Sequence, residues 1–187
     1  IYKNNLMNKN FSNNDNYLLL FWLYSLFVLV FLMIVIGGIT RITDSGLSMV
    51  EWRLIYGVLP PISNDEWKRV FELYKNTPEY FHYNNGMTLS EFKYIFFWEY
   101  FHRLWGRLIG IVFIIPLAYF LVKKKISKEV LLKLILILSF GIFQAFLGWW
   151  MVESGLHENP DVSQYRLAIH LSNALIILFL IYWLILD

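Results

Sequence analysis

Two ionisable side chains lie three residues apart at the start of a long apolar segment. Glu99 and His102 occupy positions i and i+3, which share one face of an α-helix. Gly106, one turn beyond His102, removes side-chain bulk from that same face. A carboxylate, an imidazole and a cleared surface at the edge of an apolar span are typical of the wall of a site for a flat ligand.

A second histidine, His170, lies about one turn inside the start of another apolar segment. The order of the segments makes both histidine-bearing helices run in the same direction, so the two imidazoles are expected at one membrane level. Paired histidines with small neighbours, Gly106 and Ala174, predict axial ligation of a haem iron inside a helical bundle. Zinc is less favoured, because nothing nearby supplies a third and a fourth ligand. Glu99 is then placed to orient the site, relay protons or act as a general base, and burial in a membrane favours its protonated form.

Three arginines, Arg103, Arg107 and Arg166, are expected in the same layer as the histidines. An arginine in an apolar span costs at least about 2.5–3.5 kcal/mol on insertion scales, so it usually has a partner or a function. Haem propionates are suitable partners, since a guanidinium group binds a carboxylate through two hydrogen bonds. Glu99 and Glu153 are the alternative partners, and Arg103 suits a pairing with Glu99 equally well.

Each of these residues also has a purely structural interpretation. A lone histidine near a membrane interface is more often structural, and only the matched depth of His102 and His170, with their charged neighbours, favours a ligand role. Gly106-x-x-x-Gly110 also fits a helix-packing seam. Two other functions stay open at this point: a bis-histidine, cytochrome b-like electron carrier, and a membrane assembly factor without a cofactor.

The composition indicates a membrane protein. Of the 187 residues, 58% are apolar and 19% aromatic, and the mean hydropathy is +0.50. Soluble domains are usually nearer 45–50% apolar. A net charge of +2 is too small to suggest nucleic-acid binding. The chain has no cysteine, which excludes disulfides, thiolate nucleophiles and thiolate-ligated metals.

Four uncharged or nearly uncharged stretches are long enough to cross a bilayer as helices. We therefore predict an all-α integral membrane protein, a four-transmembrane-helix bundle, with a polar tail at 1–16 and a single domain at 17–187. An outward-facing loop at 40–90 holds one short helix, which a capping box of Ser63 and Glu66 begins, and a second box of Thr88 and Glu91 starts the next long helix. The predicted spans cover residues 17–39, 95–122, 130–152 and 166–186.

Basic residues predict the orientation of the bundle. Lys123, Lys124, Lys125 and Lys128 lie in the short connection between the second and third spans, whereas the connection between the third and fourth has none. By the positive-inside rule, the lysine-rich connection and both termini face the cytoplasm or the mitochondrial matrix. The expected location is a bacterial inner membrane or the mitochondrial inner membrane.

Several segments of this chain, in order and covering most of residues 37–173, resemble the haem A synthase family, especially its mitochondrial and alphaproteobacterial form. The most specific matches are Glu99-Tyr100-Phe101-His102-Arg103 and Tyr165-Arg166-Leu167-Ala168-Ile169-His170. The other matching segments are 37–48, 58–61, 78–80, 86–93, the remainder of 97–107, and 148–156.

The resemblance implies oxidation of a ring methyl of haem O to the formyl group of haem A. It implies two tandem four-helix bundles (eight helices), with His102 and His170 as the first-half histidine pair for the substrate haem and Glu99 as the functional glutamate beside it. The implied haem of this chain is haem O as substrate and haem A as product, and a haem B that carries electrons is expected only in the second half. The implied partners are membrane lipid, an electron donor, haem O synthase and cytochrome oxidase assembly factors. This chain ends at Asp187 without a second histidine pair, so we expect a truncated or split sequence, or a second-half chain or homo-oligomer that completes it.

Overall fold

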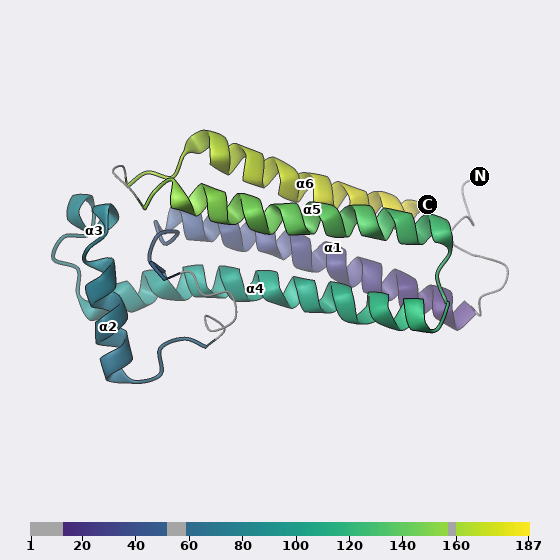
Figure 1. Ribbon diagram of the computed structural model, residues 1–187, viewed down its shortest axis with the longest axis horizontal. Helices are drawn as coiled ribbons and strands as arrows, with labels where there is room; N and C mark the ends of the chain where they lie inside the picture. Colours follow the sequence, from purple (N-terminus) through teal and green to yellow (C-terminus); the bar gives the residue numbers. More distant parts are fainter. Residues whose placement is uncertain (1–12, 52–58, 157–159) are drawn as a thin grey trace.

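The computed structural model describes residues 13–51, 59–156 and 160–187 and contains six helices within them. No strand occurs in these ranges. Four long helices are apolar enough to cross a membrane, which confirms the predicted all-α, four-helix membrane bundle (Figure 1). The helices are α1 (Asn13–Ile42), α2 (Asn64–Tyr74), α3 (Pro78–His82), α4 (Leu89–Val122), α5 (Lys128–Glu153) and α6 (Gln164–Leu186).

The long helices extend beyond the predicted spans at most of their ends. α1 starts at Asn13, inside the predicted polar tail, and its first-turn Asp15 accepts a hydrogen bond from Lys125 at 2.6 Å. An acidic residue in the first turn also interacts favourably with the helix dipole. The rest of the predicted tail, residues 1–12, lies outside the described residues, as do 52–58 of the predicted outer loop and 157–159. α4 runs without interruption through Pro116.

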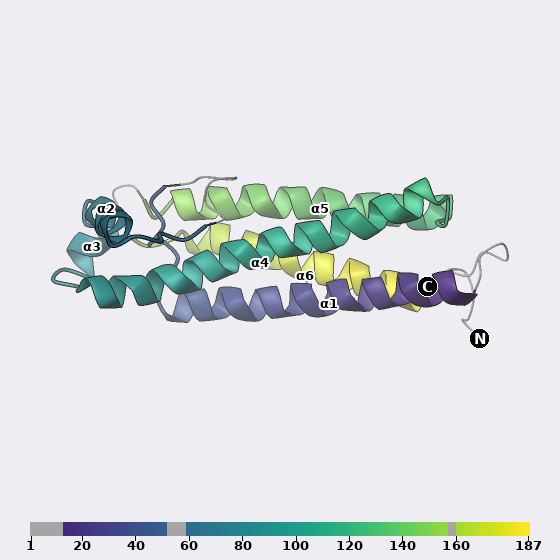
Figure 2. The same cartoon turned by 90° about the horizontal axis from the view of Figure 1, so that it is seen from below.

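The bundle has a consistent packing order. α1 lies between α4 and α6, and α6 packs in turn against α5 (Figures 1 and 2). The apolar core occupies the half of the bundle nearest the lysine-rich connection. There Trp22 of α1 packs against Phe113 and Phe120 of α4, with ring centroids 5.8 and 5.7 Å apart. The Trp22 Nε1–H donates to the Val112 carbonyl at 2.7 Å, so the buried indole is satisfied.

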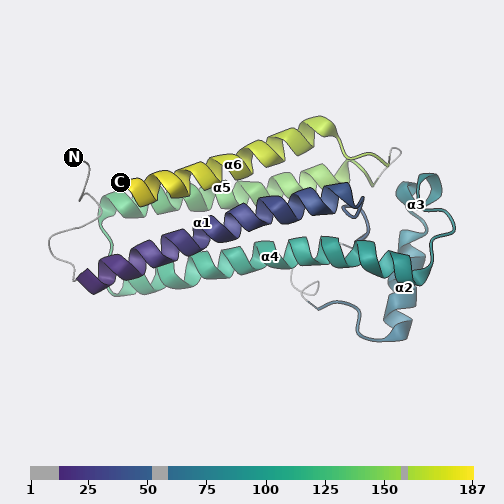
Figure 3. The same ribbon diagram turned by 180° about the vertical axis from the view of Figure 1, so that it is seen from behind.

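The short helices gather at the opposite end, which we call the outer end (Figures 1 and 3). The predicted capping box of Ser63 and Glu66 starts α2, and that of Thr88 and Glu91 starts α4. The apolar side of α2 packs on the first turns of α4, where Phe71 stacks on Phe92 at 4.9 Å. α3 was not predicted, because it is only five residues long; Thr77 caps it and Pro78 opens it.

The end away from α2 and α3 holds the start of α1, the end of α6 and the α4–α5 connection (Figure 3). Lys125 pairs with Asp15 there, and Lys133 forms an ion pair with Asp187. The cluster of lysines, the start of α1 and the end of α6 therefore lie at the same end of the bundle. We call this side the lysine end.

Candidate functional site

Glu99 is the most heavily bonded acid of the bundle. Its side chain is 3% exposed and accepts hydrogen bonds at Oε2 from Ser48 Oγ and from the Met49 backbone N–H, both at 2.7 Å. Its other oxygen, Oε1, forms an ion pair with Arg103, one turn further along α4. A cation therefore holds one carboxyl oxygen, and two further donors hold the other. These three contacts fix the position of the Glu99 carboxylate.

The segment after α1 supplies the two further donors. The Ser45 backbone N–H bonds the Thr40 carbonyl at 3.0 Å, which folds the chain back over the end of α1. Ser48 is 1% exposed, and its Oγ, which donates its single proton to Glu99 at 2.7 Å, also lies 3.1 Å from the Ser45 carbonyl oxygen. The first outer loop is thus anchored on α4 through the carboxylate.

His102 lies on α4 with its ring against the backbone of α1. A Cβ atom added at Gly37 would lie 3.0 Å from His102 Cε1 and 3.5 Å from Nδ1. Gly106, which the sequence suggested as the cleared surface, instead makes room for Met33 of α1, whose Cε would be 3.3 Å from an added Cβ. The glycine that admits the imidazole therefore belongs to the neighbouring helix.

His170 lies on α6 and is held in the same manner by α5. A Cβ added at Gly148 would lie 3.1 Å from His170 Cε1. His170 Nε2 is 3.2 Å from Gln144 Nε2, and Gln144 Oε1 accepts from Asn173 Nδ2 at 2.7 Å. Asn173 also donates to the Phe140 carbonyl at 3.1 Å. Because Asn173 fixes the amide of Gln144, the amide presents N–H to His170, which assigns the lone pair to Nε2 and the proton to Nδ1.

The two rings lie at the same level of the bundle. Gly37 is five residues from the end of α1 at Ile42, and Gly148 is five residues from the end of α5 at Glu153. Both helices end at the outer end (Figure 2).

Buried nitrogen atoms without partners are rare in the described ranges. There are three: Trp98 Nε1, His102 Nδ1 and His170 Nδ1. An unsatisfied buried polar atom costs about 1–3 kcal/mol, so such atoms call for a physical explanation. Within the same ranges no group of three or more histidine, cysteine or acidic residues could hold a metal ion. Two imidazoles on separate helices suit a metal whose remaining ligands come from elsewhere, as in haem.

The three arginines have different surroundings. Arg103 is occupied by Glu99, which matches the alternative that the sequence left open for it. Arg166 donates to the Trp150 carbonyl at 2.7 Å, and its guanidinium lies 4.5 Å from the centre of the Trp150 ring. Arg107 donates to the Arg103 carbonyl at 3.0 Å. In these contacts none of the three binds Glu153.

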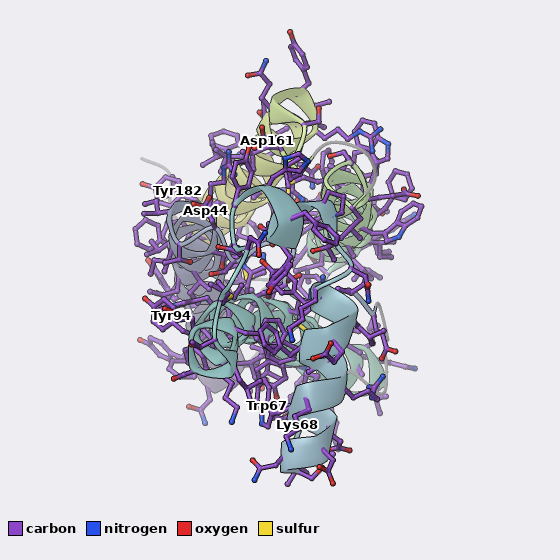
Figure 4. All side chains as sticks on the ribbon, turned by 90° about the vertical axis from the view of Figure 1, so that its left-hand side faces the viewer. Asp44, Trp67, Lys68, Tyr94, Asp161 and Tyr182 are labelled. Atoms are coloured by element: carbon purple, nitrogen blue, oxygen red, sulfur yellow. The ribbon has the colours of Figure 1, made fainter. Side chains whose placement is uncertain are left out.

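The outer loops meet above this layer. Tyr83, which follows α3, donates to the carboxylate of Asp161 in the α5–α6 connection, at 3.4 Å to Oδ2. Figure 4 looks onto this end of the molecule, where Asp44 and Asp161 are labelled. The first and third connections therefore cover the same end as the two imidazoles.

Sequence reasoning missed the residues that hold the predicted ones in place. These are Gly37, Ser48, Met49, Gln144, Gly148 and Asn173. Gln144 and Asn173 carried a usable signal, because amide side chains inside apolar spans usually hydrogen-bond across helices. A backbone N–H such as that of Met49 carries no sequence signal at all.

The chain was compared with known proteins. It is 51% identical over 175 residues to the heme A synthase of Flavobacterium psychrophilum, covering 92% of this chain and 52% of that protein. It is 52% identical over 166 residues to the heme A synthase of Nitrosospira multiformis, covering 89% and 47%. The heme A synthase of Pelagibacter ubique is 50% identical over 179 residues, covering 95% and 53%.

This chain thus spans about half the length of the curated relatives that it matches. No solved structure matches it significantly. The family profile described as "Cytochrome oxidase assembly protein" (COX15-CtaA) matches residues 20–187, which include both imidazoles and Glu99. By this match and by the identity to its relatives, the chain is a member of the COX15-CtaA family of cytochrome oxidase assembly proteins.

Proposed function

We propose that this chain forms the substrate-haem bundle of a haem A synthase, in which a ring methyl of haem O is oxidised to the formyl group of haem A. The observation that carries the proposal is the pair of buried imidazoles, His102 and His170, at one level on separate helices. The names of the relatives, all heme A synthases, support it and do not favour the electron-carrier alternative.

The residues present fit a haem. Each ring lies against a glycine that a larger residue would crowd, and His102 leaves its buried Nδ1 without a protein partner. On His170 the lone pair lies on Nε2, so the Gln144 amide would have to turn away for that nitrogen to bind a metal. His102 and His170 would hold the haem iron. The iron, when bound, supplies the redox chemistry that oxidation of the methyl group requires.

Glu99 acts in this proposal as a fixed negative charge beside His102. Its bonds to Ser48, Met49 and Arg103 hold the carboxylate in place. A carboxylate held in this way can orient the site and stabilise positive charge that develops near the imidazole layer. Removing the charge should therefore impair oxidation more than binding.

Arg107 and Arg166 are the proposed partners of the haem propionates, and Arg103 contributes through its ion pair with Glu99. Arg166 stays close to Trp150, so the indole and the guanidinium together would form one edge of the site. The second haem, a haem B that carries electrons, is proposed for the part of the relatives that this chain does not span. The lysine end is proposed to face the cytoplasm or the matrix.

The first experiment is an absorption spectrum of the detergent-purified protein, with pyridine-haemochrome typing of the bound haem. We expect haem O or haem A, lost in His102→Ala and in His170→Ala but kept in His82→Ala, since His82 is exposed on α3. Haem B alone, held by the same histidines, would instead favour the electron carrier. Protein that binds no haem after reconstitution would refute the proposal.

A second measurement separates oxidation from binding. Glu99→Gln keeps the size of the side chain and removes its charge. We expect this variant to bind haem O with a spectrum close to that of the wild type and to form no haem A. A variant that still forms haem A at the wild-type rate would exclude a catalytic role for Glu99.

A further inference from the structure

A second buried carboxyl group lies at the outer end, outside the membrane-spanning helices. Glu79, in the first turn of α3, is 5% exposed and accepts a hydrogen bond from the Tyr74 hydroxyl at 2.8 Å. Tyr74, at the end of α2, is fully buried, and its oxygen accepts in turn from Asn84 Nδ2 at 2.7 Å. These three residues form a short polar chain inside an aromatic cluster.

Asn84, the outermost residue of this hydrogen-bonded series, is in contact with the solvent. Asn84 is half-buried and lines a surface depression of about 260 Å³. The other residues that line it are Tyr83, Asn85, Gly86, Met87 and Glu91. Two hydrogen bonds, from Asn84 to Tyr74 and from Tyr74 to Glu79, join the side chain that lines the depression to the Glu79 carboxyl group.

The charges around Glu79 differ from those around Glu99. Glu99 is paired with Arg103, whereas within the described ranges no lysine, arginine or histidine forms a salt bridge with Glu79. The ionisable groups that act on Glu79 are Tyr74 from α2, Glu99 from α4 and Asp44 from the segment after α1. Glu99 also acts on Tyr74, so the fixed carboxylate interacts with both members of the outer pair.

We propose that Glu79 is the carboxyl group through which the outer end of the bundle takes up and releases protons, while the Glu99 carboxyl group is held in place by Arg103, Ser48 and Met49. A proton passes between water and a carboxyl oxygen of Glu79, while Tyr74 and Asn84 keep their own protons and act only as hydrogen-bond donors, and no electron moves in this step. The use of this proton in haem oxidation rests on the proposed function above. Oxidation of a methyl to a formyl group releases electrons and protons together, so that site needs a group that exchanges protons near it.

The electrostatics agree with the geometry. Burial raises the pKa of Glu79 to about 7, with the Glu99 and Asp44 charges adding to the rise and the hydrogen bond from Tyr74 opposing it. Burial and the charge of Glu79 raise the pKa of Tyr74 as well, so the phenol keeps its proton and remains a donor. A carboxyl group with a pKa near neutrality exchanges protons readily at working pH.

The test is a pH titration of the carboxyl stretching band by infrared difference spectroscopy, on the whole protein in lipid nanodiscs. We expect a protonated-carboxyl signal that disappears with a midpoint near pH 7 and is absent in Glu79→Gln. The matched control is Glu72→Gln, because Glu72 is an exposed acid on α2 whose partner is Lys75. It should leave the signal unchanged.

Two further variants give shifts of opposite sign. Glu99→Gln removes a negative charge and should lower the midpoint, whereas Tyr74→Phe removes a hydrogen bond to the carboxylate and should raise it. If Glu99→Gln fails to fold, Asp44→Asn in the exposed turn should lower the midpoint by a smaller amount. A wild-type midpoint near the ordinary value of about 4.3 would overturn the proposal, and so would a midpoint that ignores the charge of Glu99. The titration is read from the protein without turnover, so a failure to form haem A would refute only the proposed function.

Discussion

The close approach of His102 to the backbone of α1 can be tested with two adjacent glycines. An added Cβ at Gly37 would lie 3.0 Å from His102 Cε1, whereas an added Cβ at Gly38 meets nothing within 4 Å. Gly37→Ala and Gly38→Ala therefore make the same chemical change on the same helix. Only the first presses on the imidazole.

The size of the effect follows from ordinary contact distances. Carbon atoms at their optimum lie about 3.5–4.0 Å apart, so the ring must retreat by about half an ångström. A side chain forced roughly 30° from its rotamer costs about 0.5–1.5 kcal/mol. If His102 ligates the iron, that cost weakens haem binding roughly two- to tenfold in Gly37→Ala. Both alanines gain up to about 1 kcal/mol of helix stability, so the two effects have opposite signs in the first variant.

The assay measures haem dissociation and thermal unfolding for both variants and the wild type. We expect Gly38→Ala to keep the wild-type affinity and spectrum, and Gly37→Ala to lose affinity without losing the fold. Gly148→Ala, whose Cβ would lie 3.1 Å from His170, and Gly141→Ala, with nothing within 4 Å, form a second pair. Equal haem affinity in Gly37→Ala and Gly38→Ala would refute the idea that α1 positions the ring.

Three further predictions concern the buried polar groups. Arg103→Leu leaves a buried carboxylate without its cation and should lower the free energy of unfolding by about 3–5 kcal/mol. Arg69→Gln, in an exposed ion pair, should lower it by no more than about 1 kcal/mol. Equal losses in the two variants would contradict a stabilising role for the buried ion pair. Between pH 4.5 and about 7, Glu79 keeps its proton in the folded state, whereas the unfolded chain loses it. The free energy of unfolding should therefore fall by about 3 kcal/mol as the pH rises through this window. A free energy of unfolding that does not change over this window would contradict the raised pKa. Asn173→Leu removes two part-buried hydrogen bonds, to the Phe140 carbonyl and to Gln144 Oε1, and should cost about 1–3 kcal/mol in thermal unfolding. A neutral change would mean that water replaces the amide.

The architecture was predictable because a bilayer demands long apolar helices. The start of α4 was also predictable, since Thr88 and Glu91 form the expected capping box and the helix begins at Leu89, six residues before the predicted span at 95. The start of α1 at Asn13 was not, because it depends on Asp15 meeting Lys125 from a different connection. Local patterns therefore predict where a helix can form, and contacts from distant segments decide where it begins.

The candidate site divides in the same way. The charge and the spacing of Glu99 and His102 make both residues recognisable in the sequence. Arg103 can be predicted as a partner of Glu99, because it lies one turn further along the same helix. The residues that support them are not recognisable, because Gly37 is one of several glycines in apolar helices and nothing local distinguishes it from Gly38. Only the approach of α4 to α1 reveals that one glycine faces the imidazole and its neighbour faces open space.

The two histidines are built alike, and this determines what controls the distance between them. The His102 ring packs against α1 and the His170 ring packs against α5, so each ring is positioned by a helix other than its own. α1 and α6 are the helices that join the two pairs, through contacts such as Phe27 with Tyr182, whose ring centroids are 5.9 Å apart. A shift of α5 and α6 together along α1 would therefore change the separation of the two imidazoles while leaving each ring against its own glycine. In the haem site proposed above, the α1–α6 contact would therefore determine the distance between the two residues that hold the iron.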